Sequence, residues 1–182
     1  MSWSAQLPAE RRLSDWLVSP GSLTHRIKLA HADFRVQRLR QQAARPNPDE
    51  VGTLGLRAGR LALVREVVLF GDSRPLVYGH SVVALRHLNG PWRAVCGRGI
   101  RPLAEALYIN PAIRREPLAY RRLDARHPLY RRVCADLGDM PATLWARRSL
   151  FRRQGAPLLV TEVFLPQIVA TRDDLVRLNR AI

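Results

Sequence analysis

Two charged residues stand inside apolar segments and are the strongest candidates for chemistry in this sequence. Arg65 lies in the run LALVREVVLF (61–70), and Glu162 lies in the run PLLVTEVFL (157–165). A charge in such a segment costs several kcal/mol unless it is paired or meets an opposite charge on a ligand. The planar guanidinium of arginine holds a carboxylate through two parallel hydrogen bonds and keeps its proton. The two residues therefore suggest a pocket for a small carboxylated molecule.

Each charge also has a structural explanation. Arg65 can face solvent, or it can pair with Glu66 or Glu162. Glu162 can lie on the outer face of an edge strand, where charges discourage aggregation. On the pattern alone, the structural explanation is the more common one.

Both charged segments belong to predicted antiparallel hairpins. Residues 61–70 alternate as a strand, 71–75 form a turn, and a second apolar run follows. The segment 143–166 repeats this arrangement around a turn at 153–157. Two apolar runs joined by a short turn are typical of a β-hairpin.

The remaining elements are mostly short. Apolar spacing, caps and proline positions predict helices, strands and a loop. The helices are expected at 10–18, 23–30 (capped by Ser22), 91–99, 102–108, 127–137 and 173–182; strands at 31–42 and at 111–122, the latter an edge or a bulge because Pro117 interrupts it; and a loop at 44–50.

We therefore expect an α+β fold. It has one antiparallel sheet of about six strands, flanked and covered by short helices. The whole chain, 1–182, is predicted to be a single domain, with 1–12 and 167–182 as peripheral tails.

Composition narrows the class of protein. With 47% hydrophobic residues in 182, the chain can build a core without cross-links. Cys96 and Cys134 sit in no CxxC pair, so we expect ordinary thiols in a reducing compartment. The apolar runs are far shorter than the roughly 20 residues of a membrane span, and no leader pattern is seen. We expect a cytoplasmic protein without a membrane span.

The net charge of +15 raises the question of nucleic-acid binding. Lys28 is the only lysine among 30 basic residues, and the arginines occur as scattered pairs rather than on one element. No zinc-finger, RNP or helix-turn-helix signature accompanies them. We therefore expect no nucleic-acid partner, and attribute to the positive field the attraction of anionic metabolites.

Four segments carry a family resemblance. They are DWLVSPGSLTHRI (15–27), LVREVVLFGDSRPLVYGHSVV (63–83), RPLAEALY (101–108) and LWARRSLFRRQGAPLLVTEVFLP (144–166). In these segments the chain resembles the chorismate lyases, the UbiC-type chorismate–pyruvate lyases of ubiquinone synthesis. The resemblance implies a carbon–oxygen lyase that converts chorismate to 4-hydroxybenzoate and pyruvate, without metal or organic cofactor. We also expect a monomer.

The resemblance assigns roles by position. It implies that Arg65 grips the ring carboxylate, that Glu162 meets the ring hydroxyl at the far end, and that both are the catalytic candidates. It further implies contacts, largely through main-chain groups, at Leu23 and Leu103. Members of the family have an arginine where this chain has His80. The sequence therefore leaves His80 as a candidate contact for the second carboxylate of the substrate.

The main alternative is a non-catalytic sensor. The effector-binding (UTRA) domains of GntR-type regulators resemble this fold and bind small molecules. They normally follow a winged-helix domain, for which the sequence before Asp15 offers no room.

Overall fold

Seven strands form one antiparallel sheet in the computed structural model, which describes residues 3–5, 7, 11–93 and 103–169. The strand order is β1-β2-β3-β7-β6-β4, and β5 also pairs with β6. This confirms the predicted antiparallel sheet. The strands are β1 (Phe34–Ala44), β2 (Ala62–Gly71), β3 (Arg74–Ala84), β4 (Arg114–Arg115), β5 (Ala119–Leu123), β6 (Leu144–Arg153) and β7 (Ala156–Phe164).

Both long hairpins close through two-residue turns, so the predicted five-residue turns are wrong. Asp72 and Ser73 join β2 to β3 with φ angles of 49° and 64°. Gln154 and Gly155 join β6 to β7 with φ angles of 50° and 76°. Two consecutive left-handed residues match the right-handed twist of the flanking strands. The residues beside each turn therefore stay in the ladder.

Short helices follow the sequence pattern closely. The helix from Leu23 was predicted with its cap, and Ser22 accepts a hydrogen bond from the His25 amide. The predicted loop at 44–50 is partly wrong, because a one-turn helix begins at Pro48. Asn47 and Glu50 form a capping box at the N-terminus of this helix. The helices are α1 (Arg11–Leu17), α2 (Leu23–Ala30), α3 (Pro48–Val51), α5 (Leu103–Ile109) and α6 (Pro128–Leu137), with 3₁₀ turns η1 (Leu85–His87) and η2 (Pro166–Ile168).

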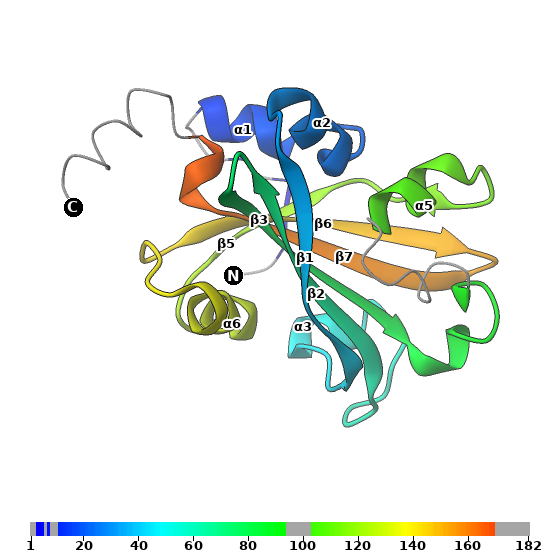
Figure 1. Cartoon of the computed structure of the whole chain (residues 1–182). Coiled ribbons are helices and arrows are strands. Elements are labelled where there is room, and N and C mark those ends of the chain that lie inside the picture. Colours follow the sequence, from blue (N-terminus) through cyan, green and yellow to red (C-terminus); the bar gives the residue numbers. More distant parts are fainter. Residues whose placement is uncertain (1–2, 6, 8–10, 94–102, 170–182) are drawn as a thin grey trace, which may run out of the picture.

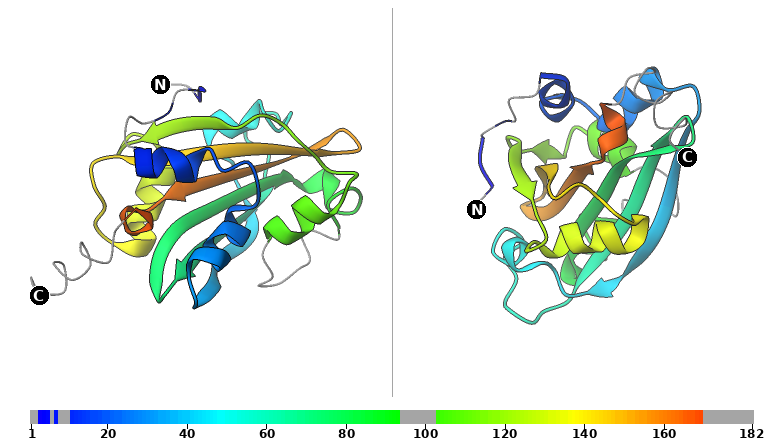
Figure 2. Two further views of the ribbon diagram at one scale, coloured as in Figure 1. Left: turned by 90° about the horizontal axis from the view of Figure 1, so that it is seen from above. Right: turned by 90° about the vertical axis from the view of Figure 1, so that its left-hand side faces the viewer.

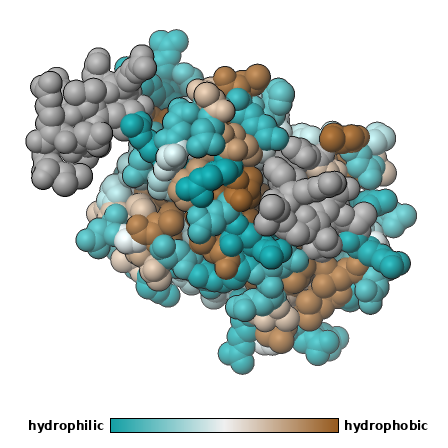
Figure 3. Space-filling model, in the orientation of Figure 1, coloured by the Kyte–Doolittle hydropathy of each residue, from teal (hydrophilic) through white to brown (hydrophobic). Residues whose placement is uncertain are grey.

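Two predicted helices cannot be compared in full. The helix expected at 173–182 and most of that expected at 91–99 lie outside the described residues. Among the helices that are described, none has both the length and the apolar character needed to cross a membrane. Mainly hydrophilic residues, with smaller hydrophobic patches between them, form the face in Figure 3.

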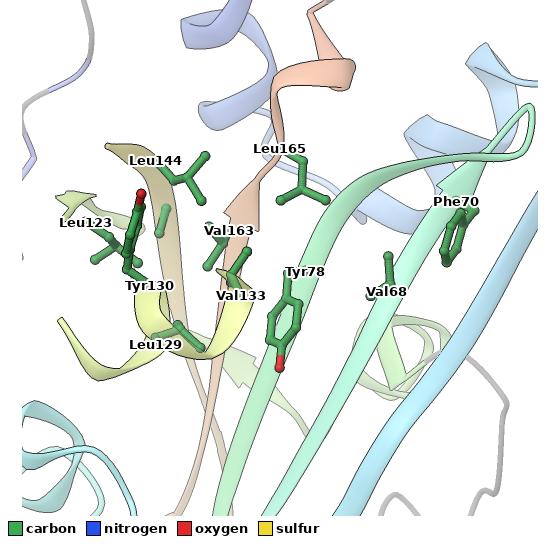
Figure 4. Close-up of a cluster of buried hydrophobic side chains, with 11 residues drawn as sticks. Val68, Phe70, Tyr78, Leu123, Leu129, Tyr130, Val133, Leu144, Val163 and Leu165 are labelled. Atoms are coloured by element: carbon green, nitrogen blue, oxygen red, sulfur yellow. The ribbon is translucent and has the colours of Figure 1, made fainter. Parts of the chain in front are cut away.

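Helices cover both faces of the sheet. Helices α1 and α2 lie above it in Figure 1, and α3 and α6 lie below; Figure 2 shows the same layers from two further sides. On the lower face, Leu129 and Val133 of α6 pack toward Tyr78 and Val163 of the sheet (Figure 4). On the upper face, Leu17 of α1 belongs to a separate apolar cluster. Burial on both sides explains why the central strands are apolar on both faces.

Candidate active site

A pocket lies between the upper face of the sheet and the helices α2 and α5. Its empty volume is about 630 Å³, including the open space at its mouth. The strands supply its floor and the two helices supply its cover. The floor includes Arg65, Val67, Gly79, Ser149, Phe151 and Glu162, and the cover includes Thr24, Leu103, Leu107 and Tyr108.

Arg65 borders the pocket from the middle of β2. Its neighbours across the ladder are Gln41 on β1 and Ser81 on β3. Only 6% of the residue is exposed. Its Nη1 donates a hydrogen bond to Oε1 of Gln41 at 3.4 Å, a neutral partner. The sheet thus holds a buried cation at this wall of the pocket.

Glu162 borders the same pocket from β7, an interior strand between β3 and β6. The edge-strand explanation for this residue is therefore wrong. Its ladder partners are Gly79 on one side and Arg147 on the other. Because Gly79 has no side chain, the floor between Glu162 and Val67 stays open.

The ion-pair partner of Glu162 is Arg147, not Arg65. Nε of Arg147 donates to Oε2 of Glu162 at 2.5 Å. Nη1 of the same guanidinium lies 2.9 Å from the carbonyl oxygen of Ser19 and 3.3 Å from that of Leu17. Arg147 is only 1% exposed. It therefore joins the carboxylate at the pocket to the end of α1 and the connection that leads to α2.

Sequence reasoning missed Arg147 because it treated the pair Arg147-Arg148 only as one of the scattered arginine pairs. Consecutive strand residues point to opposite faces. Arg147 reaches Glu162 at the pocket, whereas Arg148 contacts Asp49 at 2.8 Å on the other face. The position of Arg147 opposite Glu162 would have identified it only if the hairpin had been given a two-residue turn.

His80 does not direct its ring at a pocket ligand. Its Nδ1 lies 2.9 Å from Oε1 of Glu66, and its Nε2 lies 3.0 Å from Oε1 of Glu50, although not aligned as a hydrogen bond. Glu66 follows Arg65 on β2 and so projects from the opposite face. Both ring nitrogens thus face carboxylates beneath the sheet, so the ring does not point toward the second carboxylate of a ligand in the pocket.

The carboxylates beneath the sheet keep the imidazole charged. Burial alone would lower the pKa of His80, but Glu50 and Glu66 outweigh it and raise the pKa to about 9. Burial raises the pKa of Glu66, but hydrogen bonds from His80, Arg132 and Arg40 lower it to about 2. The result is a cluster of paired charges on the face away from the pocket.

The two predicted leucines begin the covering helices. Leu103 is the first residue of α5 and lines the pocket. Leu23 is the first residue of α2 and is 1% exposed within the upper apolar cluster, while its neighbour Thr24 lines the pocket. The structure therefore brings Arg65, Leu103 and Glu162 together around one cavity.

The sheet and its covering helices have a known α+β fold. The chain is similar in fold to the ligand-binding domain of a putative GntR-family transcriptional regulator from Bordetella bronchiseptica. The TM-score is 0.52 with 18% sequence identity, over 74% of this chain and 85% of that one. This likeness confirms the predicted fold class.

Sequence comparison gives the family. The family model for chorismate lyase matches residues 3–173. The chain is 51% identical to a probable chorismate pyruvate-lyase from Azoarcus sp. (strain BH72), with 95% of each chain covered. It is 45% identical to a probable chorismate pyruvate-lyase from Nitrosospira multiformis, over 87% of this chain and 88% of that one. The protein belongs to the chorismate lyase family.

Proposed function

We propose that this protein converts chorismate to 4-hydroxybenzoate and pyruvate, the first committed step of ubiquinone biosynthesis, in the cytoplasm. The observation that carries the proposal is the placement of Arg65 and Glu162 on one pocket. Arg65 stands on β2 and Glu162 on β7, two strands away. At ~4.8 Å for each strand spacing, this is about 10 Å across the sheet. An aromatic ring with a carboxylate at one end and a hydroxyl at the other fits between the two side chains.

The reaction needs little from the protein because the ring becomes aromatic. The bond between the ring carbon and the ether oxygen breaks, and the hydrogen on the carbon that bears the hydroxyl leaves as a proton. The enolpyruvate released takes up a proton and becomes pyruvate. The protein must chiefly orient the substrate and exclude water.

In this proposal Arg65 grips the ring carboxylate by two parallel hydrogen bonds. The backbone amide of Leu103, at the start of α5, lies on the same pocket and adds a donor for that carboxylate. Leu23 starts α2 and contributes through its main chain. Helices α2 and α5 approach each other over the pocket, so their separation lets product leave.

Glu162 meets the hydroxyl end of the ring. A carboxylate there can accept the hydroxyl hydrogen bond and can take up or share the proton that the ring loses. The ion pair with Arg147 fixes one carboxylate oxygen. The other oxygen remains to face the substrate.

The direct test is to incubate the purified protein with chorismate and to follow both pyruvate and 4-hydroxybenzoate. We expect equal amounts of the two products. Binding of 4-hydroxybenzoate without turnover of chorismate at micromolar enzyme would contradict a lyase. That outcome would instead favour a non-catalytic sensor with the fold of the regulator domains.

A further inference from the structure

Arg115 lies beside the pocket, in contact with Ser149, which lines it. It lies on β4, where it pairs with Phe151 of β6, a residue of the pocket floor. Its side chain therefore projects from the pocket face. The guanidinium carbon lies 5.5 Å from the ring centroid of Tyr108, which belongs to the pocket cover.

The hydrogen bonds of Arg115 go to neutral oxygens. Nε and Nη2 donate to Oγ of Ser149 at 3.1 and 2.9 Å, and Nη1 donates to the carbonyl oxygen of Pro20 at 2.5 Å. Within the residues that the structure describes, no carboxylate forms an ion pair with it. Glu162, the carboxylate of the pocket, pairs with Arg147 instead. Arg115 is therefore a partly buried cation that forms no close ion pair among the described residues, although Glu162 acts on it at longer range.

The order of the strands places three charges in sequence along the pocket. Arg65 is on β2, Glu162 on β7 and Arg115 on β4, in a sheet ordered β2-β3-β7-β6-β4. The strand of Glu162 therefore lies between those of the two arginines, while the register sets Arg65 two residues and Arg115 four residues along the strands from it. The pocket side of the sheet thus carries two cations and one carboxylate at different places.

Chorismate has a matching distribution of charge. One carboxylate is on the ring, opposite the carbon that carries the hydroxyl. The second is on the enolpyruvyl ether, attached to the carbon next to that hydroxyl. With the ring carboxylate on Arg65 and the hydroxyl on Glu162, the ether leaves the ring beside the hydroxyl, so the second carboxylate projects to one side of the line between these residues. Ser149 of β6, in the same ladder row as Arg65, lies on one such side.

We propose that Arg115 and Ser149 form the subsite for the enolpyruvyl carboxylate, an inference that rests on the proposed function. The guanidinium supplies charge, and the hydroxyl of Ser149 accepts from Arg115 and keeps its own hydrogen for the ligand. This assignment gives the second carboxylate a partner on the pocket face, which His80 does not offer.

A purely structural role is the alternative, because Arg115 also holds the connection between α1 and α2 through Pro20. Two ligands separate the roles. One is 4-hydroxybenzoate, which has only the ring carboxylate. The other is 3-(carboxymethoxy)-4-hydroxybenzoate, a stable aromatic acid with a second carboxylate on the ether side. A structural role affects both ligands alike, whereas a subsite affects the dicarboxylate alone.

The experiment measures both dissociation constants by calorimetry in wild type, Arg115→Gln, Arg115→Lys and Arg114→Gln. Arg114 is the matched control, an exposed neighbour on the same two-residue strand that points to the other face. We expect Arg115→Gln to raise the dissociation constant of the dicarboxylate about 10- to 100-fold, because charge-assisted hydrogen bonds are lost. The dissociation constant of 4-hydroxybenzoate should change by less than about threefold. Arg115→Lys should recover part of the loss, and Arg114→Gln should change neither ligand.

The subsite would be overturned if Arg115→Gln weakened the binding of both ligands equally, or if it left the binding of the dicarboxylate unchanged. A wild-type protein that binds neither ligand would overturn it as well. Turnover is scored separately. A protein that shows the selective loss but does not convert chorismate would refute the lyase function and leave the subsite in place.

Discussion

Glu162 and Arg147 face each other across β7 and β6, with a contact of 2.5 Å between carboxylate and guanidinium. The same guanidinium reaches the carbonyl oxygens of Leu17 and Ser19. Arg147 thereby couples the carboxylate at the pocket to the segment that leads into the covering helix α2. We regard Arg147 as a positioning residue, because it reaches the proposed substrate only through Glu162.

Two substitutions of Arg147 should separate the effect of its charge on stability from the effect of its hydrogen-bond geometry on kcat. We expect Arg147→Met to lower the free energy of unfolding by about 3–5 kcal/mol, since one partner of a buried ion pair is removed. Arg147→Lys keeps the charge but cannot reproduce the planar set of donors, so we expect kcat to fall about tenfold or more through misplacement of Glu162. Chemical denaturation measures the free energy of unfolding, and steady-state kinetics measures kcat.

The neighbouring Arg148 is the control for this experiment. It pairs with Asp49 on the opposite face of the sheet. Arg148→Lys should lower stability and leave kcat unchanged within about twofold. If both lysine variants lowered kcat equally, general weakening of β6 would explain the loss and a positioning role would be refuted.

Arg65 should determine affinity for the ring carboxylate. Arg65→Ala is expected to raise the dissociation constant of 4-hydroxybenzoate about 10- to 100-fold, because charge-assisted hydrogen bonds contribute about 1.5–3 kcal/mol. Gln41→Ala removes a neutral hydrogen-bond partner of Arg65 and should change the constant less than about fivefold. Calorimetry measures both. Unchanged binding in a folded Arg65→Ala protein would contradict the role.

Stability should pass through a maximum at weakly acidic pH. The pKa of His80 is raised from 6.5 to about 9, so its contribution is complete below pH 6.5 and is lost as pH rises to about 9. The pKa of Glu66 is lowered from 4.5 to about 2, so its contribution is complete above pH 4.5 and is lost as pH falls to about 2. These two groups predict greatest stability between pH 4.5 and 6.5.

Removal of the imidazole should flatten the alkaline side of this profile. We expect His80→Gln to lower the free energy of unfolding at pH 6 by about 3–5 kcal/mol, because Glu50 and Glu66 lose the cation between them. Between pH 6.5 and 9 the variant should lose less stability than wild type. His25→Gln, at an exposed histidine, serves as control. A variant with the wild-type slope would show that His80 is not the group that titrates.

The periodicity of apolar residues in the sequence was sufficient to predict most of the fold. Alternation identified β2, β3, β6 and β7, and the cap at Ser22 located α2. The motifs also placed Arg65 and Glu162 on one pocket. These features could be predicted because they depend on neighbouring residues: the hydrophobic period determines the strands, and the capping side chain determines the start of the helix.

The partner of Glu162 could not be predicted because register depends on turn length. A five-residue turn at 153–157 would set Arg152 opposite Leu158, and so Arg148 opposite Glu162. The two-residue turn shifts the register by one residue and brings Arg147 there instead. His80 was misjudged for a related reason, since only the sheet shows that its ring projects toward Glu50 and Glu66 rather than the pocket.

The open floor at Gly79 gives the last prediction. Gly79 lies between Val67 and Glu162, and all three residues line the pocket. A Cβ at Gly79 would come 3.0 Å from Cγ2 of Val67. We expect Gly79→Ala to weaken the binding of 4-hydroxybenzoate at least about tenfold, because the methyl group takes space that the ring needs. The double variant Gly79→Ala/Val67→Ala relieves the contact with Val67 but keeps the methyl group in the pocket. Its melting temperature should rise relative to Gly79→Ala while binding stays weak. Recovery of binding together with stability would mean that distortion of the sheet, rather than occupation of the ring site, caused the loss.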